Sequence, residues 1–464
     1  MRHGTLELDP LPSSSPRDPL NWPIWKKDVH VLMVAFHAMM TTFTAAGIIP
    51  GFHSFAVKYG TSIEQASYLT SAQILALGIF PLFWNPISKH FGRRPTFLIS
   101  TFGSCVCNIG GVFCTSYGAQ MTSRILTAVF LCPPLGIGSG VVTELFFKHE
   151  RAQKMGWWTL MTTLGTPLGP FLMGFVVQHR NVDWIFWILA IINFCQFLGY
   201  LLIDAETLYL PSEVAKQVQK SQGRFNFSRI DKTPFSFSDC FAPFYICMHL
   251  KILIPACAYA LVFCYANIAI IVEMPIIFGE KFGLDAQSIG LQYIALIIGS
   301  VLGEQLSGPL SDAFLNRYSR RTGHSHPIHR LWISYVGFLT VIVGILVWGI
   351  QLQNAKQGVW NVTPLIGAAI ASFGNQIVTT TMITFAVDNY RQKSADIGVI
   401  VNLIRQVWGF IGPFYFPLIF GNLGFAASAG IFCSIIFALG CLPVIGLHIQ
   451  GRDQKPAGDV VTVV

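Results

Sequence analysis

Residues 331–351 read LWISYVGFLTVIVGILVWGIQ, a continuous apolar run without a charged side chain. A helix of about 20 such residues crosses the roughly 30 Å hydrocarbon core of a bilayer. Runs of the same kind recur along the chain, separated by short polar segments. We therefore predict an all-α polytopic membrane protein with twelve transmembrane helices, at residues 30–50, 66–85, 95–117, 119–146, 155–177, 184–203, 252–278, 288–308, 331–351, 363–387, 397–420 and 425–448.

The composition points the same way. Of 464 residues, 53% are hydrophobic and only 11% are Asp, Glu, Lys or Arg, and the mean hydropathy is +0.55. An ordinary soluble domain carries about a quarter charged residues, and a soluble chain of this length would need charged surfaces around roughly three domains. These figures exclude soluble enzymes, disulfide-rich secreted proteins, disordered proteins and nucleic-acid binders, and they make the lipid bilayer the main solvent.

The basic residues predict the orientation, because cytoplasmic loops retain Lys and Arg. If both termini are cytoplasmic, nearly all of the 30 basic residues fall inside; the exceptions are Lys58, Arg180, Lys281 and Lys356 in outside loops and Arg124 and Arg405 within spans. We therefore expect a cytoplasmic N-terminal segment (1–29), a six-helix bundle (30–203), a cytoplasmic central loop (204–251), a second six-helix bundle (252–448) and a cytoplasmic tail (449–464).

The two predicted bundles resemble each other. Corresponding features are Asn85-Pro-Ile-Ser-Lys89 and Gly308-Pro-Leu-Ser-Asp312, the acids Glu144 and Asp388, and the interruptions Gly169-Pro170 and Gly412-Pro413. Two related halves imply a pseudo-symmetric transporter with a substrate site at the membrane midplane and alternating access by rocking of one half on the other.

Three stretches resemble signatures of the major facilitator superfamily, and within it the fungal branch of the twelve-span drug:proton antiporter family. Residues 89–95, KHFGRRP, resemble the second part of the loop signature G-x-L-x-D-x-x-G-R-R, but Asn85 and Lys89 replace its Gly and Asp. Arg124-Ile-Leu-Thr127 resembles the buried-arginine motif. Residues 165–174, GTPLGPFLMG, resemble the antiporter signature G-x-x-x-G-P-x-x-G-G.

This resemblance implies the major facilitator fold and a proton-coupled secondary transporter that exports a small organic compound across the cell membrane. It also implies a cytoplasmic gate formed by Lys89, Gly92, Arg93, Arg94, Glu144, Asp312 and Asp388, and an antiporter-motif helix marked by Gly165, Gly169, Pro170 and Gly174. A G-x-x-x-x-G-K-[ST] phosphate loop and a C-x-x-C pair do not occur in the sequence. We therefore expect no cofactor and no metal, with protons and a small molecule as partners of a monomer.

Ionisable residues within spans are the candidates for substrate binding and proton coupling. Arg124 and Arg405 each need a polar cavity or a partner, because an unpaired Arg at membrane depth costs several kcal/mol. Each could instead be tied structurally to a backbone carbonyl or to a neighbouring polar side chain. Glu304 could carry the proton or be a hydrogen-bonded structural acid. His37 could titrate near neutrality, or it could be a packed helical histidine.

The remaining motif residues also allow two interpretations. Glu144 could bind Arg93 and Arg94 in a contact that breaks as the halves rock, with Asp388 and Arg317 or Arg391 as the counterpart, or these acids could be solvated. Gly165 and Gly169 lie one helical turn apart, so they allow close helix approach, and Pro170 bends the helix. Simple helix packing would explain both. Asn361-Val-Thr363 is a glycosylation sequon on the predicted outer side.

Three other functions remain open. An uptake symporter for a nutrient such as a polyamine or organic acid is the alternative within transport. An intramembrane enzyme would need clustered His or acidic residues near the membrane face, and the His cluster at 324, 326 and 329 lies in a predicted loop. A transporter-like sensor would carry a longer cytoplasmic extension.

Overall fold

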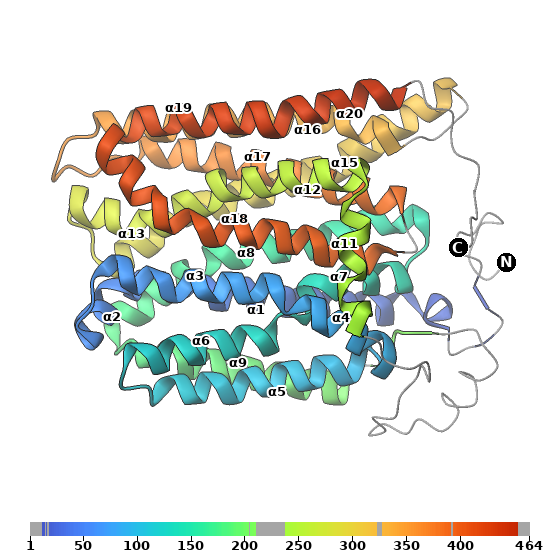
Figure 1. The fold of residues 1–464 in the computed structure, drawn as a ribbon, viewed down its shortest axis with the longest axis horizontal. Helices are drawn as coiled ribbons and strands as arrows, with labels where there is room; N and C mark the ends of the chain where they lie inside the picture. The colour runs from blue at the N-terminus through green and yellow to red at the C-terminus, as the bar shows by residue number, and fades with distance from the viewer. Residues whose placement is uncertain are drawn as a thin grey trace.

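The computed structural model describes residues 12–13, 15, 18–203, 205–209, 237–322, 327–390 and 393–452. These residues form helices, and none of them is assigned to a strand. Within this described part of the chain, eleven helices are long and apolar enough to cross a membrane, and a bent pair, Ile63–Ile79 with Pro81–Phe91, gives a twelfth if it counts as one span. In Figure 1 the long helices run side by side, with the first half of the chain below and the second half above.

The first half of the chain, called the N-half, contains helices α1 to α9. Their bounds are α1 (Ile24–Ala46), α2 (Phe52–Tyr59), α3 (Ile63–Ile79), α4 (Pro81–Phe91), α5 (Arg93–Val112), α6 (Tyr117–Leu131), α7 (Pro133–Leu145), α8 (Lys148–His179) and α9 (Asp183–Leu202), with short 3-10 turns η1 (Pro19–Asn21) and η2 (Ile49–Gly51).

The second half, called the C-half, contains helices α11 to α20. Their bounds are α11 (Ala242–Cys247), α12 (Leu250–Phe263), α13 (Ala269–Phe282), α14 (Ala286–Gln292), α15 (Ile294–Thr322), α16 (Leu331–Asn354), α17 (Thr363–Asn389), α18 (Ser394–Leu423), α19 (Phe425–Ile435) and α20 (Leu442–Arg452). Short 3-10 helices η3 (Phe237–Phe241) and η5 (Pro327–Arg330) precede α11 and α16, and the π-helical turns η4 (Cys264–Ile268) and η7 (Ile436–Cys441) interrupt two spans.

Prolines shape the spans differently from the sequence prediction. The bend of 41° between α3 and α4 falls at Pro81, and α7 begins at Pro133. The expected interruptions at Gly169-Pro170 and Gly412-Pro413 are wrong, because α8 and α18 continue through them. A proline removes one backbone hydrogen-bond donor. A chain that left the helical conformation inside the bilayer would expose several unpaired backbone groups to lipid. A continuous helix therefore has the lower free energy.

One helix continues beyond its membrane span. The eighth span is predicted to end at residue 308, which is where the candidate membrane span ends, and helix α15 continues to Thr322. Hydropathy marks where a helix leaves the hydrocarbon, whereas the helix itself can continue into water because its backbone hydrogen bonds are internal. The polar residues after 308 therefore extend the helix beyond the apolar run.

The bundle has two distinct ends. One end, called the basic end, contains Lys89, Arg93, Lys154 and Arg330 together with their acidic partners. Helices α4, α7 and α11 reach this end, which lies to the right in Figure 1, whereas α2 and α13 lie at the opposite, far end. The two ends provide the reference frame for the site described below.

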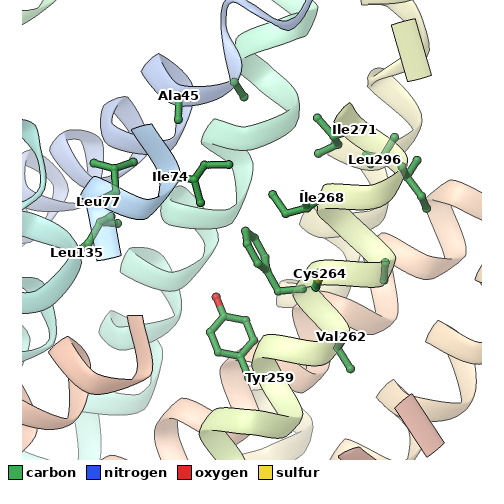
Figure 2. Packing of buried hydrophobic residues seen from close by; sticks show 14 of the residues in the cluster. Ala45, Ile74, Leu77, Leu135, Tyr259, Val262, Cys264, Ile268, Ile271 and Leu296 are labelled. Atoms are coloured by element: carbon green, nitrogen blue, oxygen red, sulfur yellow. The ribbon is translucent and has the colours of Figure 1, made fainter. Parts of the chain in front are cut away.

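Apolar side chains fill the interior of the bundle and also cover its outer surface. Leu339 and Leu418 are 63% and 64% exposed, as suits side chains that contact lipid. Between the halves, Figure 2 shows Ile74 and Leu77 of α3 facing Tyr259 of α12 and Ile268 of η4. The N-half and C-half thus meet through a mainly apolar interface, in which polar groups stand out.

Candidate functional site

A narrow cavity lies between the two halves. Its volume is about 20 Å³, so the lining side chains leave room for about one water molecule in the present conformation. Helices α7 and α8 supply one wall, and α12, α17 and α18 supply the other. The lining residues are Leu135, Trp158, Thr159, Thr162, Tyr259, Thr379, Ile383, Ile397, Gly398, Val401, Asn402 and Arg405.

Arg405 is the charged residue among these described lining residues. Its side chain is 3% exposed, and it donates from Nη1 to the Tyr259 hydroxyl and from Nη2 to Asn402 Oδ1, both at 2.9 Å. The guanidinium carbon lies 4.8 Å from the ring centroid of Phe263. Its Nε has no hydrogen-bond partner among the described residues. Arg405 therefore brings a buried positive charge to the cavity.

Asn402 connects Arg405 to the opposite half. While its Oδ1 accepts from Arg405, its Nδ2 donates to the backbone carbonyl of Leu77 in α3 at 2.9 Å. The contact joins α18 of the C-half to α3 of the N-half. Any separation of the halves along this seam must break it, so the environment of Arg405 depends on how the halves are arranged.

Glu304 of α15 lies close to the same interface. Its Oε2 accepts hydrogen bonds from Gln376 Nε2 at 2.7 Å and Thr380 Oγ1 at 2.6 Å, and the residue is 8% exposed. The Thr380 hydroxyl lies 3.4 Å from that of Thr159, which lines the cavity from the N-half. Glu304 Oε1 lies so near Gly156 of α8 that a methyl group there would collide with it. A short chain of hydroxyl groups therefore connects the carboxyl with the cavity.

The halves are closed against each other at the basic end by Asp396. This residue, in the first turn of α18, accepts from Lys89 Nζ at 2.7 Å and from Asn85 Nδ2 at 2.6 Å. Asn85 and Lys89 are the two positions that depart from the superfamily signature, and both bind one carboxylate. Sequence reasoning missed Asp396, although an acid just before a predicted span, opposite in charge to Lys89, was a usable signal.

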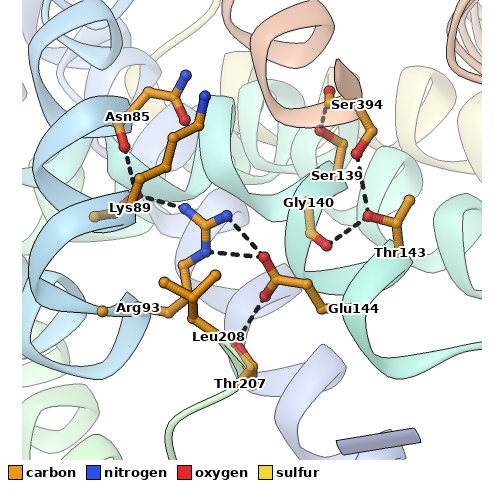
Figure 3. A network of polar contacts seen from close by, with 12 residues as sticks. Asn85, Lys89, Arg93, Ser139, Gly140, Thr143, Glu144, Thr207, Leu208 and Ser394 are labelled. Atoms are coloured by element: carbon orange, nitrogen blue, oxygen red, sulfur yellow. Dashed lines mark hydrogen bonds and ion pairs between the residues drawn. The ribbon is translucent and has the colours of Figure 1, made fainter. Parts of the chain in front are cut away.

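Close helix packing supports this closure (Figure 3). Ser139 of α7 donates to the backbone carbonyl of Ser394, and the hydroxyl groups of Thr143 and Ser394 lie 3.1 Å apart. A Cβ atom on Gly398 would lie 2.8 Å from the carbonyl oxygen of Gly136, so α18 and α7 approach as closely as their backbones allow. The wall between the cavity and the basic end is therefore made by small residues.

Arg93 and Glu144 form a second ion pair, which lies within the N-half. Arg93 donates to Glu144 Oε1 from Nη2 at 2.7 Å and from Nε at 3.2 Å, and Thr207 donates to Oε2 at 3.1 Å (Figure 3). Gly92 joins α4 to α5 with a φ of 101°, a conformation that favours glycine. These contacts fix the ends of α4, α5 and α7 relative to one another.

Glu206 holds the start of α5. Its carboxylate accepts from the backbone N–H groups of Arg93 at 2.8 Å and Arg94 at 3.1 Å, which have no acceptor within their own helix because they lie at its N-terminus. The Arg94 side chain donates to the carbonyl of Leu201 at 3.0 Å. Burial raises the pKa of the Glu206 carboxyl, and the backbone N–H groups partly oppose that rise.

The C-half carries the counterpart of the Arg93–Glu144 pair. Asp388, at the end of α17, accepts from Arg330 Nε at 3.0 Å. Arg330 was not among the partners expected for Asp388, and the side chains of Arg317 and Arg391 lie outside the described residues. The backbone of Asp312 belongs to α15, whereas its side chain also lies outside the described residues.

Arg124 is hydrogen-bonded to backbone carbonyl groups, which is one of the alternatives that the sequence left open. It is 1% exposed, and Nη2 donates to the carbonyl oxygens of Thr44 at 2.8 Å and Ala45 at 3.1 Å. Both carbonyls belong to the last turn of α1, where free acceptors and the negative end of the helix dipole favour a cation. Arg124 is not among the residues lining the cavity.

His37 packs inside the N-half and likewise does not line the cavity. Its Nδ1 lies 3.2 Å from the Tyr200 hydroxyl and its Nε2 3.2 Å from the Ser100 hydroxyl, so both ring nitrogens have partners. Phe97 contacts the ring edge-on. The expectation that His37 belongs to the substrate site is not supported by this placement, because apolar packing and two hydroxyl groups account for it.

The glycines of the antiporter-like motif make close helix contacts. Gly165 leaves no room for a Cβ beside Thr42 of α1, and a Cβ on Gly169 would lie 2.8 Å from the Phe43 carbonyl oxygen. Pro170 lies in the same continuous helix α8. Gly174 faces α14 of the C-half, where a Cβ would lie 2.7 Å from the carbonyl oxygen of Ala286. Helix packing therefore explains the contacts of this motif.

The sequon residue Asn361 lies at the far end, just before α17. Its Oδ1 accepts from the backbone N–H and from the hydroxyl group of Thr363, both at 3.0 Å. In the part of the chain that the structure describes, no cluster of three His, Cys, Asp or Glu residues could hold a metal ion.

Comparison with known proteins places this architecture in a family. The sequence-family model of the Major Facilitator Superfamily matches residues 31–413 of this chain. The chain therefore belongs to the major facilitator superfamily and is a multi-pass membrane transporter. The predicted fold class, twelve membrane helices in two pseudo-symmetric six-helix bundles, is confirmed.

Individual relatives agree with the family. The chain is 25% identical over 428 residues to the probable efflux pump mfs2 of Aspergillus flavus, covering 88% of this chain and 99% of the relative. It is 24% identical over 447 residues to the efflux pump radE of Floropilus chiversii, covering 94% and 82%. The fold matches the crystal structure of the human organic anion transporter MFSD10 (TETRAN) with a TM-score of 0.63 at 14% identity, covering 91% and 99%.

Proposed function

We propose that this protein exports a small organic compound across the cell membrane in exchange for protons. The cavity between the halves is the substrate site, and Glu304 carries the coupling proton. The observation that carries the proposal is the chain of contacts from Glu304 through Thr380 to Thr159, because it joins a buried carboxyl to the cavity across the interface of the halves. Two of the similar proteins bear the name efflux pump, which favours export.

The basic end is the cytoplasmic gate in this proposal, with both termini in the cytoplasm. Lys89 and Asn85 bind Asp396 across the two halves, so the gate is shut in the present conformation. Rocking of the halves breaks these contacts and admits substrate from the cytoplasm. Asn361, at the opposite end, then faces outside the cell, where its sequon can be glycosylated.

The position of Glu304 supports proton coupling. The buried carboxyl of Glu304 accepts two hydrogen bonds, both from neutral donors. Among the described residues it has no ionic partner that would keep it ionised. Intramembrane carboxyl groups of this kind serve proton relays. Movement between α8 and α15 changes the surroundings of this carboxyl, because Gly156 lies directly opposite it.

The test uses proteoliposomes loaded with a mixed panel of small organic acids, amides and amines. Acidifying the outside drives protons inward, so an antiporter expels at least one compound from the lumen faster, and mass spectrometry measures the loss. Glu304→Gln should keep the hydrogen-bonding shape and abolish the response to the gradient, whereas Glu64→Gln, at an exposed helix start, should keep it. Acid-driven accumulation would instead indicate uptake, and an absence of any gradient-dependent flux would refute the proposal.

A further inference from the structure

The cavity contains a buried cation without a counter-charge. Arg405 is 3% exposed, and its hydrogen bonds go to the neutral groups of Tyr259 and Asn402. Among the described residues, no carboxylate forms an ion pair with it. A buried charge is costly unless an opposite charge compensates it. The site therefore offers a positive charge that its own described surroundings leave uncompensated.

The Arg405 guanidinium also has N–H donors that form no hydrogen bond with the described residues. Arginine has five N–H donors arranged in a planar fork, and the structure assigns one acceptor to Nη1, one to Nη2 and none to Nε. The edge formed by Nε and one Nη can bind a carboxylate through two parallel hydrogen bonds. This recognition is specific to arginine, because lysine presents a point charge without the fork.

The rest of the lining suits an apolar body attached to the anionic group. Leu135, Ile383, Ile397 and Val401 surround the space, and Trp158 provides an aromatic face. The hydroxyl groups of Thr159, Thr162 and Thr379 offer a few polar contacts. Cavities with mainly apolar walls and a small number of polar groups are typical of sites for small organic ligands.

Asn402 provides a way to release Arg405 for binding. It accepts from Arg405 while donating to Leu77 of the N-half. When the halves part, the bond to Leu77 is lost and the Asn402 side chain can turn away from the guanidinium. The cavity widens in the same movement, so the donors and the space become available together.

We propose that this cavity binds an organic anion, with a carboxylate on Arg405 and an apolar, preferably aromatic, body against Trp158 and the aliphatic lining. The inference rests on the proposed function, because it names the substrate class of the same cavity. It adds charge selectivity, which neither the fold nor the family defines.

The test compares three probes with the same rings: 2-naphthoate, its neutral amide 2-naphthamide, and the cationic 2-naphthylmethylamine. Each is titrated onto the full-length protein in neutral detergent with zwitterionic lipid, and calorimetry gives the Kd. The acid should bind at least tenfold more tightly than the amide and the amine. Arg405→Gln should bind acid and amide alike, Arg405→Lys should keep a reduced preference, and the matched control Arg180→Gln, at an exposed loop, should behave as wild type.

Several outcomes would overturn the inference. These are equal binding of acid and amide to the wild-type protein, tighter binding of the amine, or no binding of the acid. The wild-type comparison decides the question even if Arg405→Gln fails to fold. Loss of 2-naphthoate binding when phosphatidylglycerol is added would assign the site to a lipid headgroup and would also overturn it.

The same probes separate this inference from the proposed function. Gradient-driven flux of a neutral or cationic compound, without anion preference, would leave proton-coupled export standing and remove the inference. Selective binding of 2-naphthoate without any gradient-driven flux of the panel would leave the anion site standing and remove proton-coupled export.

Discussion

Two arginines lie deep in the helical bundle, one in each half, and they differ in what accepts their hydrogen bonds. Arg124 donates to two backbone carbonyls at the end of α1. Arg405 donates to the side chains of Tyr259 and Asn402 beside a cavity. Backbone carbonyls at a helix end cannot move away from a cation, whereas side chains can turn. The comparison favours a structural role for Arg124 and, under the proposed function, a ligand-binding role for Arg405.

The largest expected effect is the loss of stability in Arg124→Gln. The substitution removes two hydrogen bonds from a charged donor to buried carbonyls, each worth about 1.5–3 kcal/mol. We expect the free energy of unfolding to fall by about 3 kcal/mol, measured by denaturation in detergent. Arg405→Gln should cost less, because its acceptors are side chains that can find other partners. Equal stability of Arg124→Gln and the wild-type protein would show that the bonds from Arg124 to the α1 carbonyls do not stabilise the N-half.

The second prediction concerns flux. Arg405→Gln should lower the gradient-driven flux at least about tenfold, which corresponds to about 1.4 kcal/mol, while the Tm stays close to that of the wild-type protein. The flux of Arg405→Lys should lie between those of Arg405→Gln and the wild-type protein, because lysine keeps the positive charge and lacks the planar pair of donors. The measurement is initial flux per correctly folded protein in proteoliposomes. Wild-type flux in Arg405→Gln would show that this arginine, like Arg124, is structural.

Much of the fold could be predicted from the sequence because hydropathy reports burial in lipid. It identified the spans, and it marked Arg124 and Arg405 as unusual. It could not tell their roles apart, because the acceptors of Arg124 are backbone groups some 80 residues earlier and Tyr259 lies 146 residues before Arg405. Such distances along the chain are fixed by tertiary packing alone.

The gate shows the same limit. Lys89 was recognised as a charge reversal in a familiar motif, but its partner Asp396 lies 307 residues away. The sequence leaves two interpretations of His37 open, because it does not reveal the hydroxyl groups of Tyr200 and Ser100 that lie beside its ring nitrogens. Proline was overvalued, since α8 and α18 continue through their prolines.

A third, smaller effect compares an ion pair between the halves with one inside a half. Lys89→Ala should shift the equilibrium toward an open basic end by about 1 kcal/mol, near the upper value for partly exposed pairs. Lys58→Ala, which breaks the Lys58–Asp183 pair within the N-half, should shift it by less than about 0.5 kcal/mol. The readout is the rate at which a maleimide labels Ser139→Cys, followed by mass spectrometry.

A charge swap controls this experiment. Lys89→Asp combined with Asp396→Lys restores an opposite-charge pair and should slow the labelling again, although the bond from Asn85 is lost. Identical labelling rates in Lys89→Ala, Lys58→Ala and wild-type backgrounds would show that the Lys89–Asp396 contact does not hold the basic end closed.

In the proposed mechanism, the substrate crosses between halves that must separate at the basic end. The measurement that tests this is flux through the double variant Thr143→Cys with Ser394→Cys, because the two hydroxyl groups that the sulfur atoms replace lie 3.1 Å apart on opposite halves. Oxidation should stop the gradient-driven flux and a reductant should restore it, while each single variant and the wild-type protein remain unaffected by the same treatment. Undiminished flux in the fully cross-linked protein would show that transport does not require the halves to separate at this end.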